Sequence, residues 1–461
     1  MEENAMENGY KTLKGLTVRA MTAAAEGSFI GDEAVLDTEI TSAVINSRKA
    51  VHGSAFFAIR GENTDGYNYI PSAAEKGALC CVCERAYDGY NCIVVSDVVK
   101  ALQDIARAYR AMLNITIVGI TGSVGKTTTK EVVASVLSQR YRVVKTEGNY
   151  NNGLGVPLTI LSIHADAEIA VIEMGMNHYG EMRLLSSVAR PTMCIMTNIG
   201  VSHIENFGSR ENIFEAKSEI FEYMPPTARC ILNGDDDLLR TAQRNNMCFY
   251  GFGKNNDVNI ESFCEHGFNG TDFTVNLFGE QLECRVSVPG RHILFAAMAA
   301  MAAGSWLGIP KEQLVEGVAA AKTISGRVNV IRTEKYTVID DCYNAAPQSM
   351  ESGIDLLTKC NAKRTVCILG DMGELGEEAP MLHRHVGEHA AKCGVGLLVA
   401  IGALSENMYE GCLQNGGNCL YFETKEEFLE SCSSVLLQDD VILVKASHFM
   451  DFPKIVESLT E

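Results

Sequence analysis

Residues 115–130, ITIVGITGSVGKTTTK, decide the fold prediction, because an apolar run, a glycine-rich turn and a helix-forming segment follow one another there. This order is typical of a buried parallel strand, a tight loop and a helix that begins at the loop. Gly122 and Gly125 would let backbone N–H groups turn inward on a phosphate. The Lys126 ammonium could then contact phosphate oxygens, and the Thr127 hydroxyl could ligate Mg²⁺. The stretch therefore predicts a phosphate-binding loop.

The loop departs from the usual Walker pattern at one position. That pattern has glycine five residues before its Gly-Lys pair, where this chain has Ile120. The remaining T-G-x-x-G-K-T, between a strand and a helix, still favours a nucleotide site over an accidental Lys-Thr pair after a glycine turn. The residues expected to bind the nucleotide here are Thr121, Gly122, Ser123, Val124, Gly125, Lys126, Thr127 and Thr128.

Composition excludes some classes of function. A chain of 461 residues predicts more than one domain, and 46% hydrophobic with 21% charged residues is typical of a globular protein. The net charge of −19 argues against binding nucleic acid or an anionic membrane. The sequence predicts no secretory signal and no membrane insertion. Sixteen scattered cysteines predict buried thiols in a reducing compartment, so we expect a cytoplasmic protein, and a monomer.

Alternating apolar runs and helical segments predict an α/β protein of three domains. Residues 1–98, with runs such as AFFAI, ALCCVCE and NCIVVS, are predicted to form a small α/β domain. Residues 99–325, with IAVIEM and TMCIMTNI around the loop, are predicted to form a central ATP-binding domain with a parallel sheet. Residues 326–461, with YTVIDD, TVCILGDM, GLLVAIG, NCLYF and VILVKAS, are predicted to form a Rossmann-like, doubly wound domain.

Polar side chains follow two strands of the central domain, at the edge where open α/β sheets bind ligands. Glu173 ends IAVIE and could hold a nucleotide-bound metal, although a lone Glu there is equally consistent with a solvated strand end. Asn198 and His203 follow the next strand, and Lys217 lies in the helix beyond. Taken alone, His203 is more typical of a structural histidine than of a ligand.

A third polar cluster lies in the last predicted domain, which has no phosphate loop of its own. Asp340 and Asp341 end a strand, and Tyr343 and Asn344 follow. Such a cluster predicts a domain that closes over a nucleotide bound elsewhere. Arg327, at the junction of the two domains, could then reach a phosphate.

Together these motifs resemble the Mur ligases. In chain order the matching stretches are INSRKAVHGSAFFAIRGENTDGYNYIPSAAEKGA (45–78), TGSVGKTTTKE (121–131), NYNNGLGVPLT (149–159), EMGMNHYGEM (173–182), SHIENFGSRENIFEAKSEIF (202–221), DDCYNAAPQSM (340–350) and LGDMGELG (369–376). Within the family they are most similar to the ligases that add D-alanyl-D-alanine. The D-N-P-R signature of the sister that adds meso-diaminopimelate or lysine is absent.

The resemblance implies an amide-bond ligase that uses ATP and Mg²⁺. ATP would phosphorylate the terminal carboxylate of UDP-N-acetylmuramoyl-tripeptide, and the amine of D-Ala-D-Ala would attack the acyl phosphate to give the pentapeptide precursor of peptidoglycan. Transfer between two anions needs charge neutralisation, which Lys126 and Mg²⁺ could supply. A related ligase with another amine donor, or a nucleotide-binding paralogue without turnover, remains an alternative.

The resemblance also implies roles for individual residues. The expected catalytic residues are Lys126, Glu173, His203, Lys217 and Arg327. The expected Mg²⁺ ligands are Thr127, Glu173, His203 and, if carbamylated, Lys217. Arg327 and Asp341 would complete the nucleotide site. The residues expected near the UDP-sugar end are Ser47, Arg48, Thr64 and Asp65, and those expected near the rest of the substrates are Asn149, Asn151, Asn152, Tyr343 and Asn344.

Three departures from the family's patterns each remove a polar partner. Many Mur ligases contact adenine with asparagines of an H-N-x-x-N-A motif, where this chain has Ile293 and Ala296, so adenine recognition is left open. The D-S-R motif of the first domain begins with Asn46, and the Y-N-A-N-P motif has Ala346 in place of its second asparagine.

Two further groups have a structural interpretation. Cys80 and Cys83 form a C-x-x-C, but a strand would point them in opposite directions, so buried thiols are favoured over a metal site. His385 and His389 share a helical face that could hold a metal, yet such a pair is more typical of a solvated face.

Overall fold

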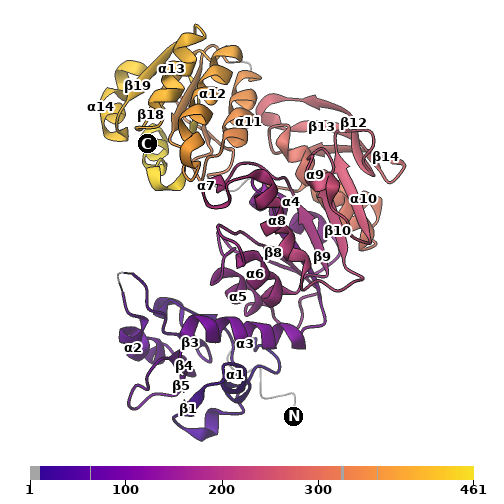
Figure 1. The fold of residues 1–461 in the computed structure, drawn as a ribbon, viewed down its shortest axis with the longest axis vertical. Helices are drawn as coiled ribbons and strands as arrows, with labels where there is room; N and C mark the ends of the chain where they lie inside the picture. The colour runs from indigo at the N-terminus through magenta and orange to yellow at the C-terminus, as the bar shows by residue number, and fades with distance from the viewer. Residues whose placement is uncertain (1–10, 63, 323–325, 361, 461) are drawn as a thin grey trace. The chain divides into compact units, whose positions relative to one another are not determined.

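The computed structural model describes residues 11–62, 64–322, 326–360 and 362–460 (Figure 1). The chain divides into two compact units. Within the described residues, the first comprises those up to 120 together with 141–194 and 217–229, and the second comprises 121–140, 195–216 and those from 230 onward. Of the limits of the predicted domains, residues 1, 325 and 461 lie outside the described residues.

A five-stranded sheet forms the N-terminal part of the first unit, with the order β1-β5-β4-β3-β2. β1 pairs antiparallel with β5, and the other neighbours pair parallel. The elements are α1 (Val18–Ala24), β1 (Ser28–Ile30), β2 (Ala43–Val44), β3 (Ala55–Phe57), α2 (Ile70–Glu75), β4 (Cys80–Cys83), β5 (Cys92–Val94) and α3 (Val98–Met112). AFFAI, ALCCVCE and NCIVVS thus form strands, as predicted. Cys80 and Cys83 are both buried, and all sixteen cysteines are free thiols.

The rest of the first unit carries three parallel strands and two helices. They are β6 (Thr116–Thr121), whose last residue belongs to the second unit, β7 (Val143–Lys145), α5 (Gly155–Ile160), β8 (Ile169–Glu173) and α6 (Glu181–Ala189). β8 pairs with both β6 and β7. Every residue of β8 is buried, which explains an apolar run that ends in a single carboxylate. The buried Arg110 of α3 donates to the Ala189 and Arg190 carbonyls and so ties α3 to the end of α6.

The predicted strand, loop and helix around the glycine-rich motif are confirmed as β6, the loop and α4 (Lys126–Leu137). The complete sheet has nine strands in the order β14-β13-β12-β11-β10-β9-β6-β8-β7. The remaining elements of this part are β9 (Met193–Met196), α7 (Ile204–Phe207), α8 (Arg210–Ser218), β10 (Arg229–Asn233), β11 (Met247–Gly251), β12 (Val258–Glu265), β13 (Thr271–Leu277), β14 (Glu280–Val286), α9 (His292–Trp306) and α10 (Lys311–Ala319). The alanine-rich α9 is largely buried, as a core helix.

The sheet differs from the predicted parallel sheet at one end, because β12, β13 and β14 pair antiparallel. In β13, TDFTVNL, buried and half-buried residues alternate strictly. The turn Phe278-Gly279, with positive φ at both residues, then closes a tight hairpin onto β14. Period-two alternation followed by a glycine turn is the signal that predicts such a hairpin.

A six-stranded sheet forms the C-terminal part, with the order β15-β16-β20-β17-β18-β19. β15 pairs antiparallel with β16, and the other neighbours pair parallel. The elements are β15 (Asn329–Arg332), β16 (Thr337–Asp340), α11 (Pro347–Thr358), β17 (Thr365–Gly370), α12 (Ala379–Lys392), β18 (Leu397–Ile401), α13 (Glu406–Gln414), β19 (Cys419–Phe422), α14 (Lys425–Val435), β20 (Val441–Lys445) and α15 (Pro453–Thr460). All five predicted strands of this domain are present.

Alternate residues of these strands enter two separate cores. Cys367 and Leu369 of β17 lie in the core formed with α11, α12 and α13. Val366 and Ile368 lie in the core formed with α14 and α15. Helices therefore cover both faces, which confirms the doubly wound prediction (Figure 1). Among the described residues, no helix combines the length and the apolar character that crossing a membrane requires.

Candidate active site

Two glycines of the phosphate loop have conformations that other residues rarely adopt. Gly125 precedes α4 with a φ of 82°, and no side chain caps the helix there. Gly122 has a φ of 144°, and a Cβ atom at this position would lie 1.9 Å from Thr197 Oγ1. The backbone conformation therefore favours glycine at both positions, and at Gly122 the lack of space requires it as well. A helix start without a side-chain cap is suited to binding an anion.

The segment that follows β9 fixes the loop. The Asn198 side chain exchanges two hydrogen bonds with the Val124 peptide unit, donating from Nδ2 and accepting at Oδ1, both at 3.1 Å. The Thr197 hydroxyl donates to the Val124 carbonyl at 2.6 Å, and the Gly200 N–H donates to Ser123 Oγ at 2.9 Å. Sequence reasoning had assigned no role to Thr197 and no loop-positioning role to Asn198. The only sequence feature that could have indicated these roles is that the two polar residues directly follow an apolar strand.

The side chain of Lys126 lies along the same loop. Its Nζ donates to the Gly122 carbonyl at 2.8 Å and to the Ser123 carbonyl at 3.2 Å. The Thr127 side chain is buried, and the buried Thr121 hydroxyl has no hydrogen-bond partner among the described residues. One short loop therefore carries an ammonium and two hydroxyl groups, and their roles toward a nucleotide stay predictions.

His203 lies at the start of α7 and is paired with a carboxylate. Its backbone is in the left-handed region, with a φ of 65°, and its Nδ1 contacts the Glu374 carboxylate, in the segment that follows β17. This contact takes up one ring nitrogen, so a metal could be held only through Nε2. The metal role of His203 stays a prediction.

The cluster at the end of β16 is built around a buried lysine. Lys445, at the end of β20, is 3% exposed and donates from Nζ to Asp341 Oδ2 at 2.6 Å and to the Asn344 carbonyl at 3.0 Å. The Val328 N–H donates to the other Asp341 oxygen at 3.2 Å. Asp341 thus makes internal contacts through both oxygens, and its nucleotide role stays a prediction.

Arg327 and Tyr343 stack on each other. The Arg327 guanidinium carbon lies 4.2 Å from the centre of the Tyr343 ring, and the His448 ring lies 6.0 Å from that ring on centroids. The structure therefore brings together two predicted residues that are separated in the sequence, since Arg327 precedes β15 and Tyr343 follows β16. It adds Lys445 and His448, which the sequence did not single out.

In the first unit, Glu173 is 2% exposed, which excludes the alternative of a solvated strand end. Its Oε1 accepts a hydrogen bond from Asn151 Nδ2 at 2.9 Å, and its backbone N–H donates to Thr146 Oγ1 at 3.0 Å. In the sheet it pairs in register with Ile120, the residue before the loop. The structure thus places Asn151, a predicted substrate residue, in direct contact with a predicted metal ligand.

The two neighbouring asparagines differ from Asn151. Asn149 is exposed. The Asn152 side-chain oxygen accepts the Leu154 and Gly155 N–H groups at 3.1 and 3.0 Å, so this residue shapes the start of α5. Substrate roles for both stay predictions.

Lys217 is 1% exposed in α8, so its side chain is placed inside the protein rather than on a helix surface. Two residues later, the Glu219 carboxylate accepts the Gly180 and Arg183 N–H groups at 3.1 Å each, at the start of α6. This carboxylate fixes α6 against the end of the helix that carries Lys217. Carbamylation of Lys217 stays a prediction.

Three of the four predicted UDP-site residues are surface-accessible, and Ser47 is buried. The Asn46 side-chain oxygen accepts the Arg48 N–H at 2.9 Å, so the asparagine that replaces the family's aspartate still supplies an acceptor. Asp65 Oδ1 accepts the Tyr67 N–H at 3.0 Å, and Oδ2 pairs with Arg60 at 3.2 Å. The Tyr67 N–H, with help from Arg60, holds the pKa of Asp65 below its usual range.

Thr64 stands next to Asp65 and is exposed, and its carbonyl accepts the Gly61 N–H at 2.8 Å. The roles of these residues toward a UDP-sugar stay predictions.

The positions of the missing adenine-binding asparagines are part of the core. Ile293 and Ala296 are 1% and 3% exposed in the first turns of α9. Burial lowers the pKa of the neighbouring His292. An asparagine at either position would have to be accommodated in apolar packing, so the two substitutions suit the local structure.

Comparisons with known proteins agree along the chain. Three family models match: "Mur ligase family, catalytic domain" at residues 39–118, "Mur ligase middle domain" at 120–304 and "Mur ligase, glutamate ligase domain" at 326–448. The UDP-N-acetylmuramoyl-tripeptide–D-alanyl-D-alanine ligase of Bacillus subtilis is 35% identical over 432 residues, covering 92% of this chain and 94% of the relative. The enzyme of the same name from Escherichia coli is 30% identical, covering 97% and 98%.

Solved structures show the same architecture. A crystal structure of MurF from Acinetobacter baumannii superimposes with a TM-score of 0.87 at 30% identity, covering 96% of this chain and 98% of that protein. MurF ligase from Thermotoga maritima, crystallised with ADP, superimposes with a TM-score of 0.79 at 27% identity, covering 90% and 96%. The similarity therefore spans all three predicted domains and includes a nucleotide-bound relative.

Proposed function

Because the chain belongs to the Mur ligase family, we propose that it joins D-alanyl-D-alanine to UDP-N-acetylmuramoyl-tripeptide, with ATP converted to ADP and phosphate. The observation that carries this proposal is the match, over at least nine-tenths of both chains, to relatives that are named for this reaction. The product is the UDP-linked pentapeptide precursor of peptidoglycan.

The chemistry requires activation of a carboxylate, because a carboxylate anion does not react with an amine. The substrate's terminal carboxylate attacks the γ-phosphorus of ATP, ADP leaves, and an acyl phosphate forms. The neutral amine of D-Ala-D-Ala then adds to the acyl carbon, and phosphate leaves from the tetrahedral intermediate as the amide forms. Lys126 stabilises the charge that builds up on the transferred phosphoryl group. The backbone N–H groups of the loop position the phosphates.

The donor set fits the Mg²⁺ that this family uses with ATP, since Mg²⁺ prefers oxygen ligands. The buried Glu173 carboxylate and the buried Thr127 hydroxyl are oxygen donors. We assign the metal to these two residues, with His203 and a carbamylated Lys217 supporting a second ion. When bound, Mg²⁺ would neutralise negative charge on the ATP phosphates.

The remaining assignments concern substrate binding. Ser47, Arg48, Thr64 and Asp65 bind the UDP-sugar end. Tyr343 and Asn344 bind near the incoming dipeptide, Arg327 and Asp341 bind near the nucleotide, and Asn149, Asn151 and Asn152 bind near the tripeptide. The stack of the Arg327 guanidinium on the Tyr343 ring supports a joint role, because displacement of one group would move the other. We further propose that the protein acts in the cytoplasm. We also propose that it is a monomer, which a measurement of its molar mass in solution would test.

The experiment is phosphate release by the purified protein with ATP, Mg²⁺ and UDP-N-acetylmuramoyl-tripeptide, in the presence and absence of D-Ala-D-Ala. Release that needs both substrates, together with a product heavier by the dipeptide, would support the proposal. Release with D-Ala-D-lactate or another amine, but not with D-Ala-D-Ala, would show that the enzyme uses a different amine donor. Tight binding of ATP and of the precursor without any release would instead identify a paralogue that no longer turns over.

A further inference from the structure

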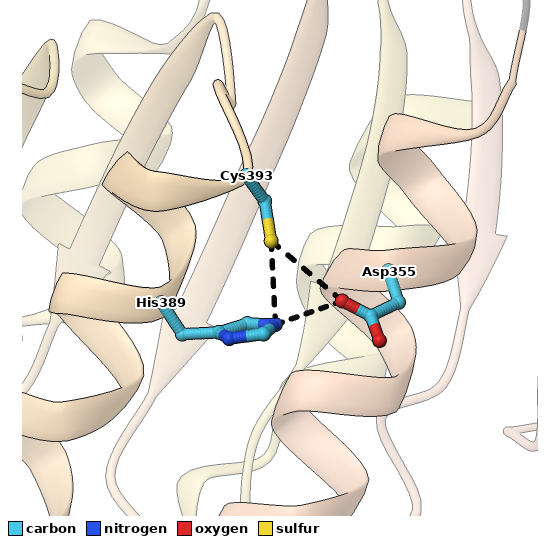
Figure 2. A group of neighbouring side chains, drawn as sticks. All are labelled: Asp355, His389 and Cys393. Atoms are coloured by element: carbon cyan, nitrogen blue, oxygen red, sulfur yellow. Dashed lines mark hydrogen bonds and ion pairs between the residues drawn. The ribbon is translucent and has the colours of Figure 1, made fainter.

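Three side chains of different chemistry converge where α11 and α12 of the C-terminal domain lie side by side (Figure 2). Asp355 comes from α11, and His389 and Cys393 come from the last turn of α12 and its C-cap. Nε2 of His389 lies 2.8 Å from Asp355 Oδ1, and Cys393 Sγ lies 3.4 Å from that nitrogen and 3.7 Å from that oxygen. Within the described residues, this is the one group of three such side chains whose donor atoms lie together.

The helices hold these atoms in place. His389 and Cys393 are four residues apart, and the Cys393 N–H donates to the His389 carbonyl at 2.9 Å, so both project from one helical face. α11 packs directly beside α12 and brings Asp355 to that face. His385, one turn earlier, is exposed and lies outside the group. His385 is exposed, as on a solvated face, whereas His389 is half-buried and hydrogen-bonded to Asp355.

The arrangement does not suit a nucleophilic thiol. In a Cys-His-Asp catalytic group, the carboxylate holds one ring nitrogen and the other nitrogen activates the thiol. Here Asp355 and Cys393 both approach the same nitrogen, Nε2 of His389. Three donors that face one point in this way form a ligand set rather than a relay.

The distances suit a tetrahedral ion. With bonds of about 2.3 Å to sulfur and about 2.05 Å to nitrogen and oxygen, a tetrahedral zinc site separates sulfur from either lighter donor by about 3.6 Å. The two distances from Cys393 Sγ, 3.4 and 3.7 Å, bracket that value. Nitrogen and oxygen would be about 3.3 Å apart in such a site. The pair at 2.8 Å, which is now hydrogen-bonded, would need to open by about half an ångström, a change that side-chain rotation can supply.

We propose that Asp355, His389 and Cys393 bind one Zn²⁺ ion, with a water molecule as the fourth ligand. The combination of thiolate, imidazole and carboxylate selects zinc over Mg²⁺, which prefers oxygen ligands alone. Asp355 lies eight residues into α11, and Cys393 follows the end of α12, so the site lies toward the opposite edge of the sheet from Asp341 and Tyr343. The ion therefore clips two helices together and takes no part in the ligase reaction.

The test uses the full-length protein, freed of metal with a chelator and then kept in excess Mg²⁺ so that nucleotide-site ligands do not compete. Titration with Co²⁺ should give one equivalent of tetrahedral cobalt with a thiolate-to-cobalt charge-transfer band, and Zn²⁺ should displace it. Cys393→Ser should abolish that band, and His389→Ala and Asp355→Asn should each weaken Zn²⁺ binding about 100-fold. At a Zn²⁺ concentration that saturates the wild type but lies below the weakened Kd of the variants, Zn²⁺ should also raise the melting temperature of the wild type and leave those of the three variants unchanged.

Two matched variants separate this site from other thiols and histidines. His385→Ala changes a histidine of the same helix, and Cys360→Ser changes a thiol at the end of α11 that bonds to the Leu356 carbonyl instead. Both should bind Co²⁺ as the wild type does. The proposal is overturned if the wild type shows no charge-transfer band, or if the band persists in Cys393→Ser. Equal loss in Cys360→Ser or His385→Ala would also overturn it. Asp355→Asn keeps the shape of the side chain, so its result decides the matter if Cys393→Ser fails to fold.

Discussion

Helices α4 and α11 begin in similar ways, yet their first turns are supported differently. Each follows the carboxyl end of a parallel strand, and neither N-cap residue, Gly125 or Ala346, caps the helix with its side chain. At α4, Thr197 and Asn198, which follow the neighbouring strand β9, hold the loop from outside. At α11, the support is local, because Ser349 Oγ accepts the Ala346 N–H at 3.0 Å.

The difference separates an uncapped helix start that serves function from one that is incidental. A loop braced by a second strand keeps its backbone N–H groups in position without covering them, as a phosphate site requires. A helix start that is supported by a side chain of its own first turn stabilises only that helix. We therefore expect changes at α4 to affect catalysis first and changes at α11 to affect stability first.

The largest effect is expected from Lys126→Ala. Loss of the ammonium removes charge stabilisation at the phosphoryl group, so kcat should fall by about 10³-fold or more, while the fold is retained. Steady-state phosphate release measures the first and circular dichroism the second. Lys311→Ala is the control, since Lys311 forms an exposed ion pair with Glu280 on α10 and β14 and should leave kcat unchanged. Normal turnover in Lys126→Ala would refute the assignment of the loop.

A smaller effect is expected from Gly122→Ala, which adds a Cβ atom 1.9 Å from Thr197 Oγ1 at a φ of 144°. The free energy of unfolding should fall by about 2–3 kcal/mol, and ATP binding should weaken with it. Gly125→Ala is the matched variant, because a Cβ there meets no atom within 4 Å and carries only the backbone penalty of about 1–2 kcal/mol. Urea unfolding of both variants measures the difference in the free energy of unfolding. Equal losses would show that the contact with Thr197 does not contribute to the destabilisation.

The phosphate loop also shows which parts of the fold and of the site can be predicted from the sequence alone. The strand, turn and helix around Lys126 are local patterns, and so were the five strands of the C-terminal domain. Glu173 was placed at a buried strand end by the same reasoning. The contact of Asn198 with Val124 joins residues 74 apart, and that of Lys445 with Asp341 joins residues 104 apart. No local period or spacing encodes such pairs, so they became visible only once the strands were arranged in sheets.

Positions where this chain departs from its family were the hardest to interpret. Without a structure, Ile293 and Ala346 were each only a missing asparagine. Burial now explains Ile293 by the apolar packing of α9. Ala346 stands at the N-cap of α11, where the Ser349 hydroxyl accepts its N–H and no side chain caps the helix. Asn46 keeps the acceptor that an aspartate would supply. The same kind of departure thus has three physical meanings, which the residue type alone does not distinguish.

The brace of the loop can be tested apart from the lysine by Asn198→Ala. Removal of the two hydrogen bonds to Val124 should let the loop shift, so kcat/KM for ATP should fall by about 10–100-fold. A positioning role predicts a change in the KM for ATP but not in the KM for D-Ala-D-Ala. It also predicts a melting temperature close to that of the wild type. A uniform loss of stability with unchanged kinetics of the folded fraction would make Asn198 a structural residue only.

The smallest effect, and one of opposite sign, is expected from Ala346→Asn. An asparagine side chain at this N-cap could accept the N–H of Ser349 or Gln348, which should stabilise the protein by about 1 kcal/mol without changing kcat. Ser349→Ala removes the present local repair and should destabilise the wild type. It should cost less in the Ala346→Asn background, and a double-mutant cycle of melting curves would measure this coupling. If Ala346→Asn instead altered the KM for D-Ala-D-Ala and left stability unchanged, α11 would have to be grouped with α4 as a helix whose bare first turn serves the substrate.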